Sequence, residues 1–187
     1  MRLTALPLTS EAIYRALRAQ QGRPLALFGG GHVGQALVKV LADLPFHVRW
    51  IDSRDEVFPP GTPRHVQTEH SAPVHAAVAD LASGSLVLIM SFSHAEDLAV
   101  LAHCLRRARE FDDVPFIGLI GSATKWARFQ KRLAELGHSP YDIAKITCPI
   151  GQPALGKHPH AIALGVATDF LLQPTKRAQP KEALCSI

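Results

Sequence analysis

Short apolar runs alternate with amphipathic segments along most of the chain. The runs are nearly uninterrupted, as in strands that are buried on both faces of a parallel sheet. The runs that predict strands lie at residues 24–28, 48–52, 85–90 and 115–120. The segments that predict helices lie at residues 33–42, 98–109 and 122–136. This alternation predicts an α/β fold: a Rossmann-like, doubly wound and mostly parallel sheet of about five to six strands with helices on both faces.

Weaker signals complete the pattern. Residues 65–68 fit a short third strand, and residues 73–81 fit a short helix. Residues 159–172 predict a last helix that is apolar on most sides and is therefore expected to be buried. The interpretation divides the chain into an N-terminal helix or linker, a Rossmann-like domain and a loosely ordered tail, at residues 1–22, 23–173 and 174–187.

A glycine fingerprint follows the first predicted strand. Gly29, Gly31 and Gly34 form G-x-G-x-x-G between an apolar run and an amphipathic segment. In such a motif the first glycine permits a tight turn, and the second lets a phosphate approach the backbone. The third lets the helix pack closely on the strand. The amides and the positive dipole end of that helix attract an anion, so the motif predicts a nucleotide-binding unit of the Rossmann type.

Asp52 ends the second predicted strand, 18 residues after Gly34. A dinucleotide-binding fold places an acid there to accept a hydrogen bond from a ribose hydroxyl, so we expect Asp52 to contact a sugar. Capping of a turn ahead of Arg54 is the alternative role. Arg54 itself raises the option of an added 2′-phosphate on the ligand.

Ligands of open α/β sheets bind beyond the carboxyl ends of the strands, and we call this edge of the sheet the rim. The segments predicted at the rim are Gly29–Gly34, Asp52–Arg54, Ser91–His94 and Gly121–Lys125. Ser93 and Glu96 have the spacing of a capping box, which is a structural role, and His94 would then face the rim from the first helical turn.

Two further side chains are ambiguous. Lys125 lies close to a predicted helix N-terminus, where a cation is unfavourable unless an anion is nearby. Two interpretations are therefore open: a phosphate binds beside Lys125, or Lys125 belongs to a plain basic surface. Cys148 is either a small core residue or a soft metal or sulfur ligand. No Ser-His-Asp order, pair of catalytic carboxylates or H-E-x-x-H motif is recognisable, and no room remains for the substrate domain of a self-sufficient dehydrogenase.

Composition narrows the class of protein. The 187 residues suffice for one domain with a sizeable core, and hydrophobic residues make up 47% and charged residues 19% of the chain. The net charge of +4 is too small to imply nucleic acid. No apolar run approaches the ~18–20 residues of a membrane span, and no signal peptide is recognisable, so we expect a cytoplasmic protein. Three separated cysteines make neither a disulfide framework nor a metal cluster.

Several segments together resemble one family. In chain order they are Phe28–Gly34, Trp50–Arg54, Ser93–His94, Ile117–Lys125 and Cys148–Gly151. They look like the C-terminal Rossmann domain of the XdhC/CoxI family, the xanthine dehydrogenase accessory proteins, over residues 24 to 172. The Gly-Leu-Ile-Gly-Ser and Cys-Pro-Ile-Gly signatures are much more specific than the glycine fingerprint.

The resemblance implies a molybdenum-cofactor chaperone rather than an enzyme. Proteins of this family bind molybdopterin, shield it while it acquires its terminal sulfur, and help to insert it into apo-xanthine dehydrogenase. Their partners are that enzyme and a cysteine desulfurase, the sulfurase. Carried over to this chain, the cofactor-binding residues would be Gly29, Gly31, His32, Gly34, Asp52, Arg54, His94, Ser122 and Lys125. The metal ligands are unknown, with Cys148 as a candidate.

Some expectations stay open. Longer members of the family have an N-terminal domain that helps to hold the metal end, so molybdenum ligation is less supported than pterin or nucleotide binding. An NAD(P)-binding oxidoreductase fragment and a nucleotide-sensing regulatory module are the alternatives. The last helix could form a homodimer through Ile162, Leu164, Val166 and Phe170, or these residues could simply pack into the core.

Overall fold

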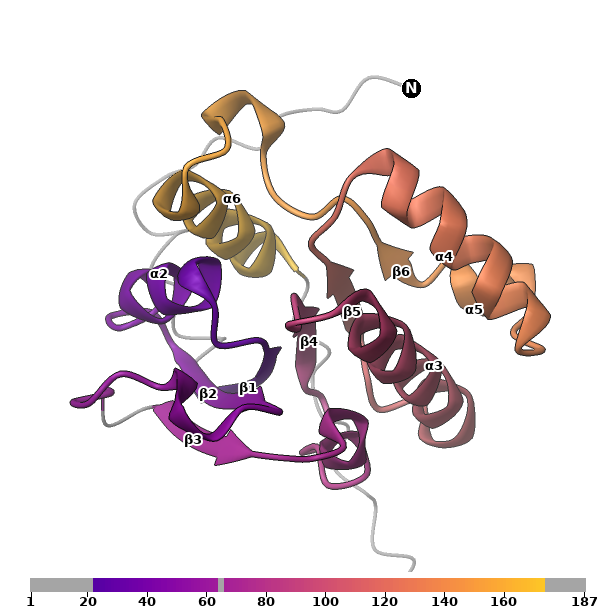
Figure 1. Cartoon of the computed structure of the whole chain (residues 1–187), viewed down its shortest axis with the longest axis horizontal. Helices are drawn as coiled ribbons and strands as arrows, with labels where there is room; N and C mark the ends of the chain where they lie inside the picture. The colour runs from indigo at the N-terminus through magenta and orange to yellow at the C-terminus, as the bar shows by residue number, and fades with distance from the viewer. Residues whose placement is uncertain (1–21, 64–65, 174–187) are drawn as a thin grey trace, which may run out of the picture.

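The predicted strands assemble into one parallel sheet. A computed structural model describes residues 22–63 and 66–173 (Figure 1). The strands are β1 (Arg23–Phe28), β2 (Phe46–Asp52), β3 (Val66–His70), β4 (Leu86–Ile89), β5 (Phe116–Leu119) and β6 (Ile146–Thr147). Their order is β3-β2-β1-β4-β5-β6, and each neighbouring pair is parallel. The fold is therefore of the Rossmann type, fully parallel over the described residues rather than mostly parallel.

Helices cover both faces of the sheet. They are α2 (His32–Val40), α3 (His94–Phe111), α4 (Ala123–Glu135), α5 (Pro140–Ile143) and α6 (Pro159–Leu172), with short 3-10 turns η1 (Asp55–Val57), η2 (Val74–Val78) and η3 (Pro153–Leu155). Figure 1 shows α2 beside α6 on one side of the sheet and α3 with α4 and α5 on the other. The doubly wound arrangement expected from the sequence is confirmed.

Successive residues of β1 explain why its sequence is apolar throughout. Leu25 and Leu27 pack into the core under α2 and α6, whereas Ala26 and Phe28 pack into the core under α3 and η2. All four are buried, because neighbouring side chains of a strand point to opposite faces and helices cover both. This two-sided burial fixes the register of the strands whose ends form the rim.

The ends of several elements differ from the prediction. α3 begins at His94 rather than residue 98, because Ser93 caps it: the Ser93 hydroxyl accepts a hydrogen bond from the Glu96 amide at 3.2 Å. Residues 74–78 form a 3-10 turn in place of the predicted helix over 73–81. Residues 137–148, expected as a turn and a short segment, contribute α5 and the edge strand β6. The N-terminal helix or linker expected at residues 1–22, apart from Gly22, and the tail at 174–187 lie outside the described residues.

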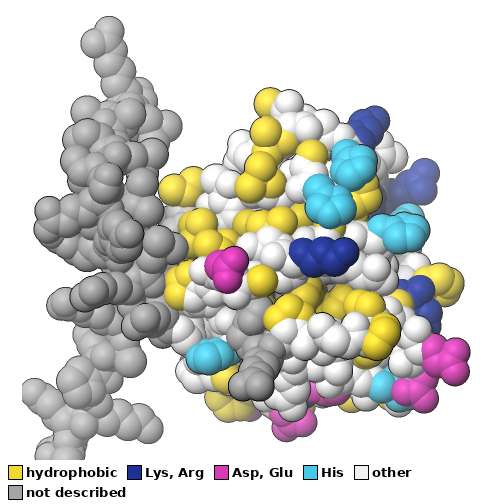
Figure 2. Space-filling model, turned by 90° about the vertical axis from the view of Figure 1, so that its left-hand side faces the viewer, with side chains coloured by type: hydrophobic (Ala, Val, Ile, Leu, Met, Phe, Trp, Pro, Cys, Tyr) yellow, Lys and Arg dark blue, Asp and Glu magenta, His cyan; other side chains and the backbone are white. Residues whose placement is uncertain are grey.

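The last helix has the predicted bounds but not uniform burial. Val166 and Phe170 are fully buried against α2 and the sheet, so they cannot form the proposed dimer interface as the domain stands. Leu164 is 52% exposed. Figure 2 shows the face on this side of the molecule, where small groups of hydrophobic side chains alternate with polar ones. Core packing is therefore the main role of α6. Among the helices of the described ranges, none is both long and apolar enough for a membrane crossing.

The glycine positions give a direct test of the packing at the start of α2. A Cβ atom at Gly34 would collide with the carbonyl oxygen of Gly29, whereas a Cβ atom at Gly31 would meet no atom within 4 Å. We expect Gly34→Ala to lower the free energy of unfolding by about 1–3 kcal/mol, as overpacking does. Gly31→Ala is the matched control and should cost less, about 1 kcal/mol or below in denaturant unfolding, because it adds no clash and only replaces the glycine N-cap. Equal losses in both variants would contradict this account of the packing.

Candidate functional site

The four predicted segments do meet at one edge of the sheet. β1, β2, β4 and β5 are parallel, and their carboxyl ends lead into Gly29–Gly34, Asp52–Arg54, Ser91–His94 and Gly121–Lys125. β1 is followed by a helix on one face and β4 by a helix on the other, so the connections diverge between these two neighbouring strands. This divergence is the switch point at which parallel α/β sheets form a ligand crevice.

The loop between β1 and α2 is held by the neighbouring strands on both sides. Gly29 has a φ of 126°, in the region that favours glycine, and a Cβ there would collide with the Met90 carbonyl. The Gly29 amide donates to the Ile51 carbonyl at 2.8 Å. The Trp50 indole Nε1 donates to the Gly29 carbonyl at 2.9 Å, and the Asp52 carboxylate accepts from the Gly30 amide at 2.6 Å. β2 therefore fixes the position of the loop.

The N-terminus of α2 is open towards the rim. Gly31 is its N-cap, no side chain caps it, and its first turn contains no acidic residue. A Cβ at Gly31 would enter open space, which is the property that lets a ligand approach the backbone. His32 is the exposed first residue of the helix. Unpaired amides at a helix N-terminus and the helix dipole suit an anion at this place.

Asp52 is engaged by the chain itself. The carboxylate is 2% exposed and accepts four hydrogen bonds: from the Gly30 amide and from the amide, Nε and Nη2 of Arg54. Burial raises the pKa of Asp52, but the bonds from Arg54 and Gly30 outweigh burial, so that the pKa is lowered overall. Four bonds use the acceptor sites of a carboxylate. A ribose contact, which stays a prediction, would therefore need one of these bonds to be displaced.

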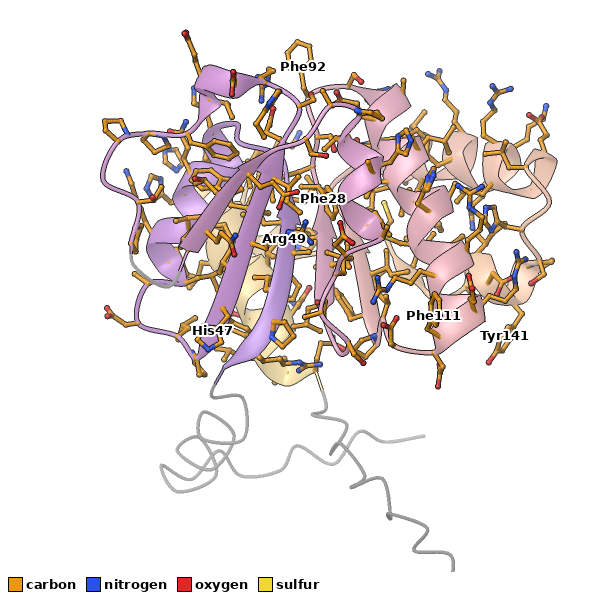
Figure 3. All side chains as sticks on the ribbon, turned by 90° about the horizontal axis from the view of Figure 1, so that it is seen from below. Phe28, His47, Arg49, Phe92, Phe111 and Tyr141 are labelled. Carbon is orange, nitrogen blue, oxygen red and sulfur yellow. The ribbon has the colours of Figure 1, made fainter. Side chains whose placement is uncertain are left out.

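Arg54 lies against an exposed aromatic ring that the sequence analysis did not single out. Its guanidinium carbon is 4.6 Å from the centroid of the Phe92 ring, and Phe92 is 69% exposed. Figure 3 shows Phe92 at the carboxyl ends of the strands, at the opposite end of the sheet from His47 near the start of β2. The aromatic ring and the guanidinium, whose charge is paired with Asp52, form a flat surface at the rim. An apolar residue between two serines directly after a buried strand was the available signal.

Lys125 forms an ion pair with a carboxylate of the same chain. Its Nζ donates to the Asp97 carboxylate at 2.5 Å and to the Ile120 carbonyl at 2.9 Å. Asp97 is buried in the first turn of α3 and also accepts from the Ser91 amide at 2.7 Å. The prediction that a cation here needs an anion is thus satisfied by a carboxylate 28 positions away. The ion pair links the ends of β4 and β5.

Two polar atoms at the rim lack partners. Ser53 Oγ donates to one Glu96 oxygen at 2.5 Å, whereas the other Glu96 oxygen, Oε2, is buried with no hydrogen bond among the described residues. The hydroxyl of Ser91 is also buried and has no hydrogen-bond partner among the described residues. Only half of the expected capping box therefore forms, because Glu96 turns to Ser53 instead of the Ser93 amide. Buried groups without partners are uncommon and often mark a binding position.

The remaining candidates lie close to the rim but differ in character. His94 is exposed, and its ring stands edge-on to Phe129 with centroids 6.0 Å apart. Ser122 caps α4, and its hydroxyl accepts from the Lys125 amide at 3.1 Å. Cys148 is half-buried against the core under α3, and burial raises the pKa of its thiol to about 11. The packing of Cys148 against this core fits the role of a small core residue, and a metal contact of Cys148 stays a prediction.

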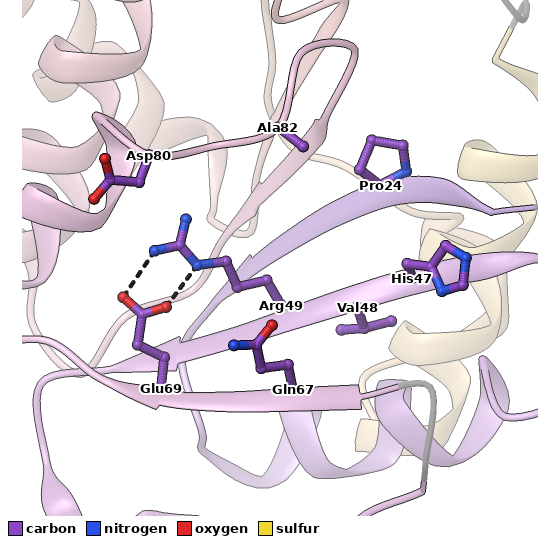
Figure 4. A pocket seen from close by; sticks show the side chains of 8 residues that line it. All are labelled: Pro24, His47, Val48, Arg49, Gln67, Glu69, Asp80 and Ala82. Atoms are coloured by element: carbon purple, nitrogen blue, oxygen red, sulfur yellow. Dashed lines mark hydrogen bonds and ion pairs between the residues drawn. The ribbon is translucent and has the colours of Figure 1, made fainter.

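A separate cavity lies away from the rim. It has a volume of about 590 Å³ and opens over the amino-terminal halves of β1, β2 and β3, with Asp80 and Ala82 on its other side (Figure 4). Arg49 crosses it and forms a two-point ion pair with Glu69, at 2.5 and 2.9 Å. Its main charges thus neutralise each other, and the residues predicted from the sequence do not line it. We place the candidate site at the rim.

Comparison with known proteins agrees with this fold. The XdhC Rossmann domain family matches residues 25–170. The protein YqeB of Escherichia coli K12 is 28% identical over 152 residues, which cover 79% of this chain and 26% of YqeB. A crystal structure of a xanthine dehydrogenase from Bacillus halodurans superposes with a TM-score of 0.67 at 20% identity, over 85% of this chain and 45% of that chain. The chain thus spans about a quarter and a little under half of these two proteins.

The bonds around Asp52 predict a pH dependence of stability. Because the pKa of Asp52 is lower in the folded protein, its ionised form stabilises the fold above the unfolded carboxyl pKa of about 3.9. That contribution is lost as the pH falls through the folded pKa. In chemical unfolding, Asp52→Asn should have a lower unfolding free energy than the parent at neutral pH. The difference in unfolding free energy between the two should become smaller in acid. Asp43→Asn, at an exposed position, is the control: its difference in unfolding free energy from the parent should not become smaller in acid.

The ion pair of Lys125 predicts a large loss on truncation. Lys125→Met leaves the buried Asp97 carboxylate without its cation, and we expect about 3–5 kcal/mol less unfolding free energy. The matched control is Arg132→Met on the same helix, whose ion pair with Glu135 is exposed and should contribute about 0–1 kcal/mol. Comparable losses of unfolding free energy in the two variants would contradict a larger contribution from the buried pair.

Proposed function

The chain belongs to the XdhC family through its Rossmann domain, and on this premise we propose that it is an accessory factor of a molybdenum enzyme. It binds molybdenum cofactor and assists the sulfuration of the cofactor and its insertion into apo-xanthine dehydrogenase. It acts as a carrier and not as a catalyst. The partners in this proposal are the target enzyme and a sulfurase, both of which the family resemblance implies.

One observation carries the proposal: the uncapped N-terminus of α2 beside the open space over Gly31. Molybdopterin ends in a phosphate. A phosphate accepts hydrogen bonds from free helix amides and is attracted by the helix dipole, without any charged side chain in the first turn. The phosphate of the cofactor would lie on residues 31–34, with His32 at its side.

The flat surface of Phe92 and Arg54 supports the ring end of the ligand. A pterin is a planar, polar heterocycle, and such rings stack on aromatic faces and on guanidinium groups. Asp52 holds the Arg54 guanidinium by two bonds, so the stacking surface is ordered before the ligand arrives.

The metal end of the cofactor has less support. Over residues 22–63 and 66–173, no group of three or more His, Cys, Asp or Glu side chains is placed to hold a metal ion. The proposal therefore assigns the phosphate and the ring to this domain and leaves Cys148 as a candidate metal contact. When bound, the cofactor supplies the metal centre, and the chain supplies a shaped and charged surface.

NAD(P) binding is the second candidate function, because the strand order is that of dinucleotide-binding folds. The engagement of the Asp52 carboxylate by Gly30 and Arg54 weighs against it, since a ribose hydroxyl has to compete for an acceptor site. A nucleotide-sensing module would share the fold and differ in its response: ligand would change the oligomeric state.

The proposal is tested by the ligand that the protein retains. We expect native mass spectrometry with metal analysis to find pterin on protein purified from cells that make molybdenum cofactor. Gly31→Val fills the space over the loop and Phe92→Ala removes the stacking face, so both should abolish or strongly reduce retention. Phe111→Ala, an exposed position at the far end of α3, is the matched control and should retain the ligand.

The alternative outcomes are distinct. Pterin without molybdenum would support ring and phosphate binding and place metal ligation outside this domain. NAD(P) in place of pterin would refute the carrier role and favour a dinucleotide-binding function.

A further inference from the structure

A small cavity lies on the outer face of α3, away from the rim. It has a volume of about 250 Å³ and is formed where α3 meets the end of α4. Its lining residues are Ala99, Ala102, His103, Arg106, Arg109, Leu136, Gly137 and His138. The volume is below the roughly 300–1,000 Å³ of sites for drug-sized ligands, so the cavity suits a small group. We call it the outer cavity.

Its charged side chains are both cations. Arg106 and Arg109 are three positions apart on α3 and so lie on one face of the helix, where like charges repel. Arg107, between them, pairs with Asp113 at 2.6 Å, but neither Arg106 nor Arg109 forms an ion pair with any described residue. The buried carboxylate of Asp142 lies nearby, but it already accepts hydrogen bonds from the Ser139 hydroxyl and from Lys145. An anion in the outer cavity would relieve the repulsion.

His138 adds a buried ring nitrogen without a partner to this pair of arginines. It is 7% exposed, and its Nδ1 is buried with no hydrogen-bond partner among the described residues. Burial and the charges of Arg109 and Arg106 lower the pKa of His138, opposed by Asp142, so the ring is neutral near neutral pH. In the tautomer with its proton on Nδ1, the ring donates one hydrogen bond. When Nδ1 carries the proton, this buried atom needs an acceptor, and an anion in the outer cavity is of that kind.

We propose that the outer cavity binds a phosphoryl group, as free phosphate or as a phosphate monoester, through Arg106, Arg109 and His138. Two guanidinium groups and a ring nitrogen match the several oxygens and the double charge of a phosphate better than the single charge of a carboxylate. Leu136, which is 59% exposed, and the alanines of α3 provide an apolar wall for the carbon part of an ester.

The test follows the ring of His138 by NMR during titration with inorganic phosphate, phosphoserine and acetate at constant ionic strength. We expect both phosphates to shift the His138 signals saturably and to raise its pKa, because a bound dianion favours the protonated ring. Acetate should not reproduce the shift. Tighter binding of phosphoserine than of inorganic phosphate would identify an ester as the ligand, and equal binding would identify free phosphate.

Variants separate this site from other anion sites. The double variant Arg106→Gln, Arg109→Gln should weaken phosphate binding about tenfold or more, as loss of charge-assisted hydrogen bonds does. Arg128→Gln makes one such replacement at an exposed position on α4 and should have no effect. Gly31→Val, which blocks the proposed cofactor site, should leave the His138 response unchanged, so the two proposals can fail independently. A folded double variant with the parent's response, or a parent without one, would overturn the proposal.

Discussion

The close contact of the β1–α2 loop with its neighbouring strands is the constraint on which the rest of the structure depends. The main chain of Phe28 and Gly29 bonds to both adjacent strands: Gly29 donates to Ile51 of β2, and Met90, after β4, donates to Phe28. Gly29 and Gly34 tolerate no Cβ because their neighbours are backbone atoms. The loop therefore cannot move without opening the sheet, and the amides of α2 point in a direction that the sheet determines.

The rim is organised by buried charges that pair within the chain. Asp52 with Arg54, and Asp97 with Lys125, place two ion pairs at the carboxyl ends of β2, β4 and β5. Buried ion pairs add little net stability because desolvation offsets their attraction, so their role here is orientation. One pair holds the guanidinium beside Phe92, and the other joins the starts of α3 and α4. Both cations are neutralised by their carboxylate partners, so the feature left at the rim to attract an anion is the uncapped N-terminus of α2.

Much of the fold was predictable from local patterns, and part of the site was not. The strands from β1 to β5 and the helices α2, α4 and α6 were predicted within a few residues. Their two-sided burial and helical periodicity produce patterns that can be recognised in neighbouring residues of the sequence. β6 was missed because it has two residues, too few for any periodicity. The positions of Gly29, Asp52 and Lys125 at the rim followed from the strand ends. Their contacts did not follow, and neither did the importance of Asp97 and Phe92.

The sequence by itself determined the α/β class, the parallel sheet, the glycine loop and the family, since all of these depend on the order and spacing of nearby residues. Tertiary structure alone decided which charges meet. Lys125 is paired with Asp97 because the strand order sets β5 directly beside β4. Likewise, Arg54 lies on Phe92 because the ends of β2 and β4 flank β1. Pairings between distant residues depend on strand order and rotamers, which the local pattern of hydrophobic and polar residues does not encode.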